Sequence, residues 1–206
     1  MSVTGIPINV GFAQQPDHAA VRRQFGLPTD NQPVVLITRG TKGYDARFTL
    51  QVLAALAQAH LPITIVANAG RNPALVARMR EVLQHADPAQ TRHVFGWIDN
   101  MHELLAVTDV LVAKPGGLTL AEALARGVPM LAFRPIPGQE DANVAFLERH
   151  RIGQLVRTPG EAAAAVRHLV DSQAALTTMK ARAAALGFSD GAYRAARQVL
   201  ADLAER

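Results

Sequence analysis

The sequence contains no cysteine and few aromatic residues, which make up 5% of the chain. The absence of cysteine excludes disulfide bonds, thiol nucleophiles and thiolate metal sites. Because the few aromatic residues do not alternate with basic ones, nothing in the sequence indicates nucleic-acid binding. The 21 Lys and Arg residues are scattered among 17 Asp and Glu residues, so the formal charge of +4 indicates only a weak attraction for anionic ligands or lipid surfaces.

Long hydrophobic runs are also missing. No window holds about 18 consecutive apolar residues, and the N-terminus lacks a charged segment followed by an apolar run. We therefore expect a cytoplasmic protein. The sequence has no Asp-x-Asp pair, and its seven histidines show no ligand spacing, so we expect no metal site.

The hydrophobic content of 49% over 206 residues is enough for one sizeable core. From residue 34 onward, apolar runs of strand length alternate with segments of helical period. This alternation predicts an α/β fold with a parallel sheet that is covered by helices on both faces. Strands are expected at residues 34–38, 63–67, 93–95, 110–113, 130–133 and 154–156, and helices at 46–59, 73–85, 101–107, 118–126, 141–150, 161–170, 174–186 and 191–203.

Residues 1–15 contain Gly5, Pro7 and Gly11, and we expect them to form an extended lead-in outside the core. Residues 16–206 are expected to form one domain, which begins with a short helix at 16–25. The last helix carries an apolar stripe that we expect to be partly exposed and to favour self-association. The stripe consists of Ala196, Val199, Leu200 and Leu203.

The stretch from residue 109 to 129 organises the rest of the chain. A short apolar strand passes through a turn with Gly116 and Gly117 into a helix that ends near Gly127 and Pro129. Free N–H groups at a helix N-terminus bind phosphate, and paired glycines let an anion approach closely. The alternative is a tight strand-to-helix connection that binds nothing.

In parallel sheets, ligands bind beyond the carboxyl ends of the strands, so the loops at these ends are the candidate sites. Gly40, Lys42 and Gly43 form a basic turn after the first strand, a candidate phosphate loop whose lysine is alternatively a solvated charge. This turn matches neither a dinucleotide fingerprint nor a P-loop. After the third strand come the only tryptophan, Trp97, and Asn100, which we expect to be the N-cap residue of the next helix.

Taken in order, these segments resemble the donor-binding half of the diacylglycerol glycosyltransferase family. That family includes monogalactosyldiacylglycerol synthases and processive diacylglycerol glucosyltransferases, and it is more distantly similar to the N-acetylglucosaminyltransferase of peptidoglycan synthesis. The resemblance covers nearly the whole chain but only the second half of a family member. The residues that carry it are Gly96 to Met101, KPGGLTLAEA at 114–123, Gly127-Val-Pro, and Ile136 to Glu140 with Asn143.

The resemblance implies the C-terminal Rossmann-like domain of a GT-B glycosyltransferase, with a UDP-sugar as co-substrate and no cofactor or metal. By position, the residues that match the donor site are Gly96, Trp97 and Ile98 for uracil; Glu122 for ribose; Gly116, Gly117, Leu118 and Thr119 for diphosphate; and Gln139, Glu140 and Asn143 for the hexose. Met101, Pro137 and Gly138 also match the donor site, without an assigned part of the donor. The spacing alone places Gln139 and Asn143 on one helix face. The alternative roles are a favourable helix-dipole charge for Glu122 and helix capping for the polar side chains near 140.

The activity that the resemblance implies is inverting hexosyl transfer to a lipid acceptor such as diacylglycerol, in glycolipid biosynthesis. The family's N-terminal domain supplies the acceptor groove, the membrane contact and the catalytic base. We expect this domain to be missing here, so that the chain binds the donor but transfers little alone, and we assign it no catalytic residue. The membrane contact would be peripheral, at the inner face. Two alternatives are a stand-alone donor-binding module of a split transferase and an epimerase-like enzyme using Asp99, Glu140 or Asp141.

Overall fold

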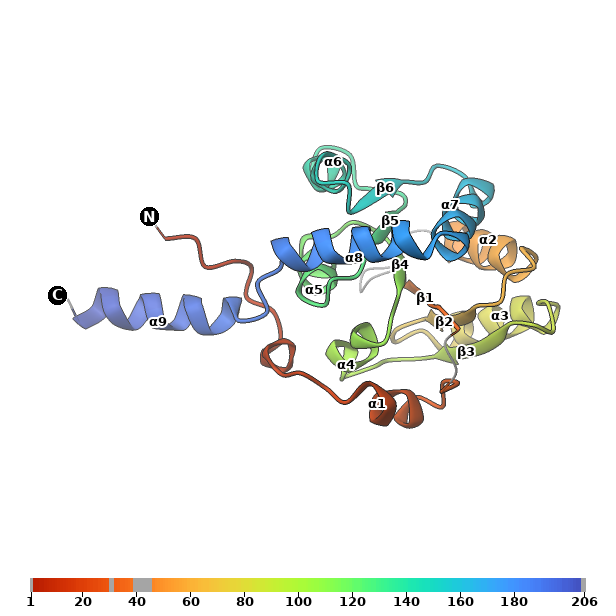
Figure 1. The fold of residues 1–206 in the computed structure, drawn as a ribbon, viewed down its shortest axis with the longest axis horizontal. Helices are drawn as coiled ribbons and strands as arrows, with labels where there is room; N and C mark the ends of the chain where they lie inside the picture. Colours follow the sequence, from red (N-terminus) through yellow and green to blue (C-terminus); the bar gives the residue numbers. More distant parts are fainter. Residues whose placement is uncertain (1, 30–31, 39–45, 205–206) are drawn as a thin grey trace.

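The computed structural model describes residues 2–29, 32–38 and 46–204 (Figure 1). Its centre is a six-stranded sheet with the order β3-β2-β1-β4-β5-β6, and every pair of neighbouring strands is parallel. The predicted parallel sheet is therefore confirmed, and each predicted strand boundary lies within two residues of the observed one. The strands are β1 (Val34–Thr38), β2 (Thr64–Asn68), β3 (Thr91–Phe95), β4 (Val110–Ala113), β5 (Met130–Ala132) and β6 (Gly153–Leu155).

Helices cover both faces of the sheet because alternate strand residues are buried on opposite sides. Val35 and Ile37 pack with α2, α3 and α7, whereas Val34 and Leu36 pack with α1, α4 and α5. The helices are η1 (Val10–Ala13, a 3₁₀ turn), α1 (His18–Gln24), α2 (Ala46–Ala57), α3 (Pro73–Gln84), α4 (Met101–Ala106), α5 (Gly117–Ala125), α6 (Asp141–Arg149), α7 (Pro159–Asp171), α8 (Gln173–Leu186) and α9 (Gly191–Ala204). None of these helices is long and apolar enough to cross a membrane.

The strand order reverses between β1 and β4. From β1 the chain continues outward through β2 and β3, and it then returns to pair β4 with the other side of β1. The register aligns Thr38 with Asn68 on one side and with Ala113 on the other, so three strands end at the same level. Loops that leave such a point diverge, and they leave a crevice at the carboxyl edge of the sheet.

The last helix, α9, projects away from the body of the domain, beside the N-terminal segment (Figure 1). Its Val199, Leu200 and Leu203 side chains are 57%, 66% and 61% exposed, and Ala196 is exposed as well. The predicted exposure of the apolar stripe is therefore confirmed. Self-association through this stripe stays a prediction.

The N-terminal lead-in differs from the expectation. Ile8 and Phe12 are only 6% and 1% exposed, and both belong to the core on the α4 and α5 side of the sheet. Residues Val10–Ala13 form the 3₁₀ turn η1, with the Asn9 side chain accepting from the Gly11 N–H. The expectation that this segment lies outside the core is wrong, because Ile8 and Phe12 pack in one cluster with residues of α4 and α5 that are far away in sequence. The domain division after residue 15 stays a prediction.

Arg126, at the end of α5, holds this segment in place. Its guanidinium donates to the carbonyl oxygens of His102 at 2.9 Å, Gln14 at 2.8 Å and Gly11 at 3.1 Å. It also lies over the Phe12 ring, 5.3 Å from the ring centroid. One side chain therefore ties the lead-in to both α4 and α5.

We predict that Arg126→Met releases the lead-in. Loss of three charge-assisted hydrogen bonds should lower the free energy of unfolding by about 1.5–3 kcal/mol and increase hydrogen exchange at residues 9–14. Arg78→Met, on the exposed face of α3, is the matched control and should change neither quantity. Exchange at residues 9–14 that matches the wild type in Arg126→Met would contradict this role.

Candidate functional site

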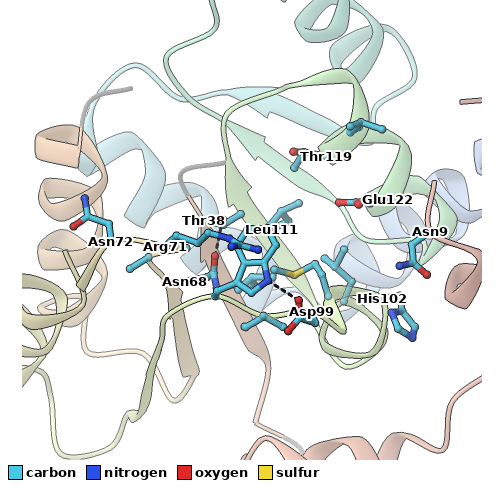
Figure 2. A pocket seen from close by; sticks show the side chains of 18 of the residues that line it. Asn9, Thr38, Asn68, Arg71, Asn72, Asp99, His102, Leu111, Thr119 and Glu122 are labelled. Carbon is cyan, nitrogen blue, oxygen red and sulfur yellow. Dashed lines mark hydrogen bonds between the residues drawn. The ribbon is translucent and has the colours of Figure 1, made fainter. Parts of the chain in front are cut away.

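A cavity of about 690 Å³ lies at the carboxyl edge of the sheet, where the strand order reverses (Figure 2). Leu36 of β1 and Leu111 of β4 line it, together with Thr38 and Asn68 at the ends of β1 and β2. This volume is in the range of small-molecule and cofactor sites. The fold therefore places a ligand-sized cavity where doubly wound sheets bind nucleotides.

A buried hydrogen-bond chain connects the strand ends beneath the cavity. The Thr38 hydroxyl donates to Asn68 Oδ1 at 3.4 Å, and Asn68 Nδ2 donates to the Gly96 carbonyl oxygen at 2.6 Å. Asn68 is 6% exposed, so leaving its amide unpaired would be costly. These two hydrogen bonds fix the loop after β3 relative to β1 and β2.

One wall of the cavity is a flat stack of two side chains. The Arg71 guanidinium lies 4.1 Å from the centroid of the Trp97 ring, and Trp97 Nε1 donates to Asp99 Oδ1 at 2.6 Å. Gly70 has a φ of +61°, which lets the chain turn sharply after β2 and brings Arg71 back over the ring. Because Trp97 is held on one face and at its nitrogen, it forms a pre-ordered wall.

The opposite wall is α5. Leu118, Thr119 and Glu122 line the cavity from this helix, and Figure 2 shows Thr119 and Glu122 one turn apart above it. Gly116 is the N-cap residue, and in the described part of the chain no side chain caps α5. The first N–H groups of the helix are therefore available to an anion.

Glu122 is the titratable group that the cavity perturbs most clearly. It is partly buried, and this burial raises the pKa of its carboxyl group. Desolvation disfavours the charged form when no cation is near. A ligand that donates hydrogen bonds to this carboxylate would offset the cost of burying it.

The loop before α6 packs against the turn that precedes α5. Glu140 Oε1 lies 2.8 Å from Lys114 Nζ, and Glu140 Oε2 accepts from the Ile136 N–H at 2.8 Å. Asn143 Nδ2 donates to the Pro115 carbonyl oxygen at 2.8 Å. The two loops that were matched to diphosphate and hexose binding therefore lie side by side.

Gln139 differs from the expectation, whereas Asn100 occupies the expected N-cap position. α6 begins at Asp141, so Gln139 lies in the preceding turn, exposed, and the predicted helix face shared with Asn143 is wrong. The turn forms because Gly138 has a φ of +77° and its N–H donates to Asp141. Asn100 does occupy the N-cap position of α4, but its side chain contacts Glu103 and caps no N–H group.

Six of the fourteen predicted donor-site residues line the cavity. Trp97, Ile98, Met101, Leu118, Thr119 and Glu122 line it. The Gly96 carbonyl oxygen accepts the hydrogen bond from Asn68, and α5 begins at Gly116 and Gly117. The other predicted residues lie outside the cavity lining: Pro137, Gly138, Gln139, Glu140 and Asn143. Gly40, Lys42 and Gly43 lie outside the described residues, so their role stays a prediction.

Several lining residues were not predicted from the sequence. They include Asn9, Phe12, Thr38, Asn68, Arg71 and His102. Asn68 had a usable signal, because a polar residue directly after an apolar strand lies at the sheet edge where ligands bind.

Among the described residues, no three His, Asp or Glu side chains are placed to hold a metal ion. Donor binding without metal or cofactor stays a prediction.

Comparisons with known proteins identify relatives of this arrangement. A model of the family described as "Glycosyltransferase family 28 C-terminal domain" matches residues 34–195. A processive diacylglycerol beta-glucosyltransferase of Bacillus pumilus is 32% identical over 180 residues, which cover 87% of this chain and 46% of that protein. The chain spans about half the length of the curated relatives it matches.

Solved structures share the fold at lower identity. MurG of Acinetobacter baumannii aligns with a TM-score of 0.72 and 21% identity over 93% of this chain and 54% of its own. UDP-GlcNAc 2-epimerase of Neisseria meningitidis, bound to UDP-GlcNAc, aligns with a TM-score of 0.63 and 16% identity over 91% of this chain and 48% of its own. At these identities the likeness establishes the fold alone.

We predict that Glu122→Gln stabilises the folded chain at neutral pH. Because burial raises the pKa of this carboxyl above its unfolded value, the folded state binds the proton more tightly than the unfolded state. The stability that this proton contributes is complete below the unfolded pKa and is lost as pH rises through the folded pKa. Glutamine stays neutral, so the variant should melt at a higher temperature than the wild type at pH 7, and the difference should shrink towards pH 4.

Thermal unfolding followed between pH 4 and pH 8 measures this effect. Glu81→Gln, on the exposed part of α3, is the matched control and should show no such pH-dependent gain. A melting temperature of Glu122→Gln below that of the wild type at pH 7 would contradict the prediction.

Proposed function

Because the chain belongs to the glycosyltransferase family 28 C-terminal domain family, we propose that it binds the UDP-sugar donor of an inverting hexosyl transfer to a lipid acceptor. The observation that supports this most directly is the cavity between the uncapped start of α5 and the Trp97 wall, with Glu122 facing it. Diacylglycerol is the acceptor named for the curated relatives, and we propose an acceptor of that class at the inner membrane face.

In the proposed arrangement the donor lies across the end of the sheet. Uracil occupies the end near Trp97, Ile98 and Met101, where the backbone is fixed by Asn68. The ribose hydroxyls donate to Glu122, which lies one helical turn beyond Thr119. This position follows from the helix itself, since residues three apart share a face.

The diphosphate is proposed to lie at the start of α5. The N–H groups of the first turn and the Thr119 hydroxyl are donors there, and the positive end of the helix dipole favours negative charge. Sugar transfer develops negative charge on the departing diphosphate, so donors that are fixed before the reaction lower its barrier. The hexose extends towards the loop before α6, where Gln139 and Asn143 offer amide groups.

The epimerase alternative has no comparable support. The epimerase likeness is a likeness of fold at 16% identity, whereas the curated relatives at 30–32% identity are named glucosyltransferases. The other alternative, a stand-alone donor-binding module of a split transferase, would bind the same ligand in the same cavity as the donor-binding half of a longer enzyme. The proposal also includes the lipid acceptor, the membrane contact and self-association. These three parts do not rest on the cavity.

We predict that Glu122→Gln weakens UDP binding although it stabilises the fold. Loss of charge-assisted hydrogen bonds from the ribose should cost about 1.5–3 kcal/mol, or roughly 10–150-fold in affinity by titration calorimetry. UDP lacking both ribose hydroxyls is the matched ligand, and its affinity should be the same for the wild type and the variant. Equal UDP affinity in the two proteins would remove Glu122 from the ribose site, and no UDP binding by the wild type would overturn the proposed function.

A further inference from the structure

A buried ion pair joins the end of β4 to the start of α6. Lys114 Nζ and Glu140 Oε1 are 2.8 Å apart, and their side chains are only 15% and 6% exposed. A pair this buried is costly to form, because both charges lose most of their hydration. Its location beside the donor cavity therefore calls for a functional explanation as well as a structural one.

Glu140 brings negative charge to the corner where α5 begins. Its Oε1 lies 3.7 Å from the point where a Cβ on Gly116 would be, and Thr119 Oγ1 lies 3.9 Å from the same point. These are the residues at which the diphosphate is proposed to bind. A carboxylate without a partner at this corner would repel the diphosphate, and its burial would weaken the screening by salt.

The same carboxylate also sets the shape of the neighbouring loop. Its other oxygen accepts from the Ile136 N–H at 2.8 Å, which closes the turn before α6. Asn143 Nδ2, one turn into the helix, donates to the Pro115 carbonyl at 2.8 Å. The loop proposed for the hexose is thus fixed to the turn proposed for the diphosphate through Glu140 and Asn143.

We infer that Lys114 and Glu140 act as a charge-compensating positioning pair for the diphosphate of the donor. Glu140 orders the loop before α6, and Lys114 neutralises Glu140 so that the start of α5 accepts an anion. This inference rests on the proposed function, because it concerns the same ligand. It assigns to Lys114 a role that acts through Glu140 and needs no direct contact with the reacting atoms.

The test compares UDP with uridine, which lacks the charged group. Lys114→Met leaves the carboxylate uncompensated, and the ratio of UDP affinity to uridine affinity should fall about tenfold or more. In Lys114→Met/Glu140→Gln both charges are gone and an oxygen remains for the Ile136 N–H, so the ratio should return to within about threefold of the wild type. Titration calorimetry with both ligands gives each ratio.

The chain offers a matched control in a second lysine ion pair among the described residues. Lys180 Nζ lies 2.8 Å from Asp109 Oδ1, the same separation, but the pair joins α8 to the residue before β4, away from the start of α5. Lys180→Met should lower stability and leave the ratio unchanged. A purely structural role for Lys114 would lower the affinities for UDP and uridine together.

Each outcome decides between the possibilities. An unchanged ratio in Lys114→Met, or a ratio that stays low in the double variant, overturns the compensation by Lys114. If Lys114→Met does not fold, the single variant Glu140→Gln provides the test. Its ratio of UDP affinity to uridine affinity should equal or exceed that of the wild type, and a lower ratio overturns the inference. Absence of UDP binding by the wild type would instead overturn the proposed function.

Discussion

The constraint on which the structure depends is a parallel sheet buried on both faces. Strands such as β1 and β2 are almost wholly covered by helices, so polar side chains reach a ligand only at the strand ends. Because β1 pairs with both β2 and β4, the strand order reverses at β1, and the loops after β2 and β4 begin at the carboxyl edge beside it. The cavity, the start of α5 and the Trp97 wall are all located by this one reversal of strand order.

The electrostatics of the site follow from placing two carboxylates near a helix start that no side chain caps among the described residues. Glu122 faces the cavity with its pKa raised by burial, whereas Glu140 is paired with Lys114. The first arrangement costs stability in the empty protein and is relieved by a ligand that donates hydrogen bonds. The second is compensated within the protein itself. The difference fits a ribose site beside the one carboxylate and a diphosphate site beside the other.

The sequence predicted the sheet and the helices, because these depend on local period, and the glycine turn before α5, because it lies in one continuous stretch. The residues of the α5 wall were matched to the site only through the family resemblance. The sequence did not predict the Arg71 stack, because that contact depends on the positive φ of Gly70 and joins two loops far apart in sequence. It predicted that Gln139 would share a helix face with Asn143, but Gln139 lies in the turn at Gly138, before α6 begins at Asp141. It also left Phe12 outside the core, since the contact that holds it comes from Arg126, more than a hundred residues away. Long-range side-chain contacts were thus the part that local pattern did not supply.

Arg126 connects the N-terminal segment to the cavity wall. Asn9 and Phe12 line the cavity, and the segment that carries them is held by the guanidinium at the far end of α5. Arg126 is not among the residues that line the cavity. Two residues of the cavity wall, Asn9 and Phe12, therefore depend for their position on a side chain that lies outside that wall.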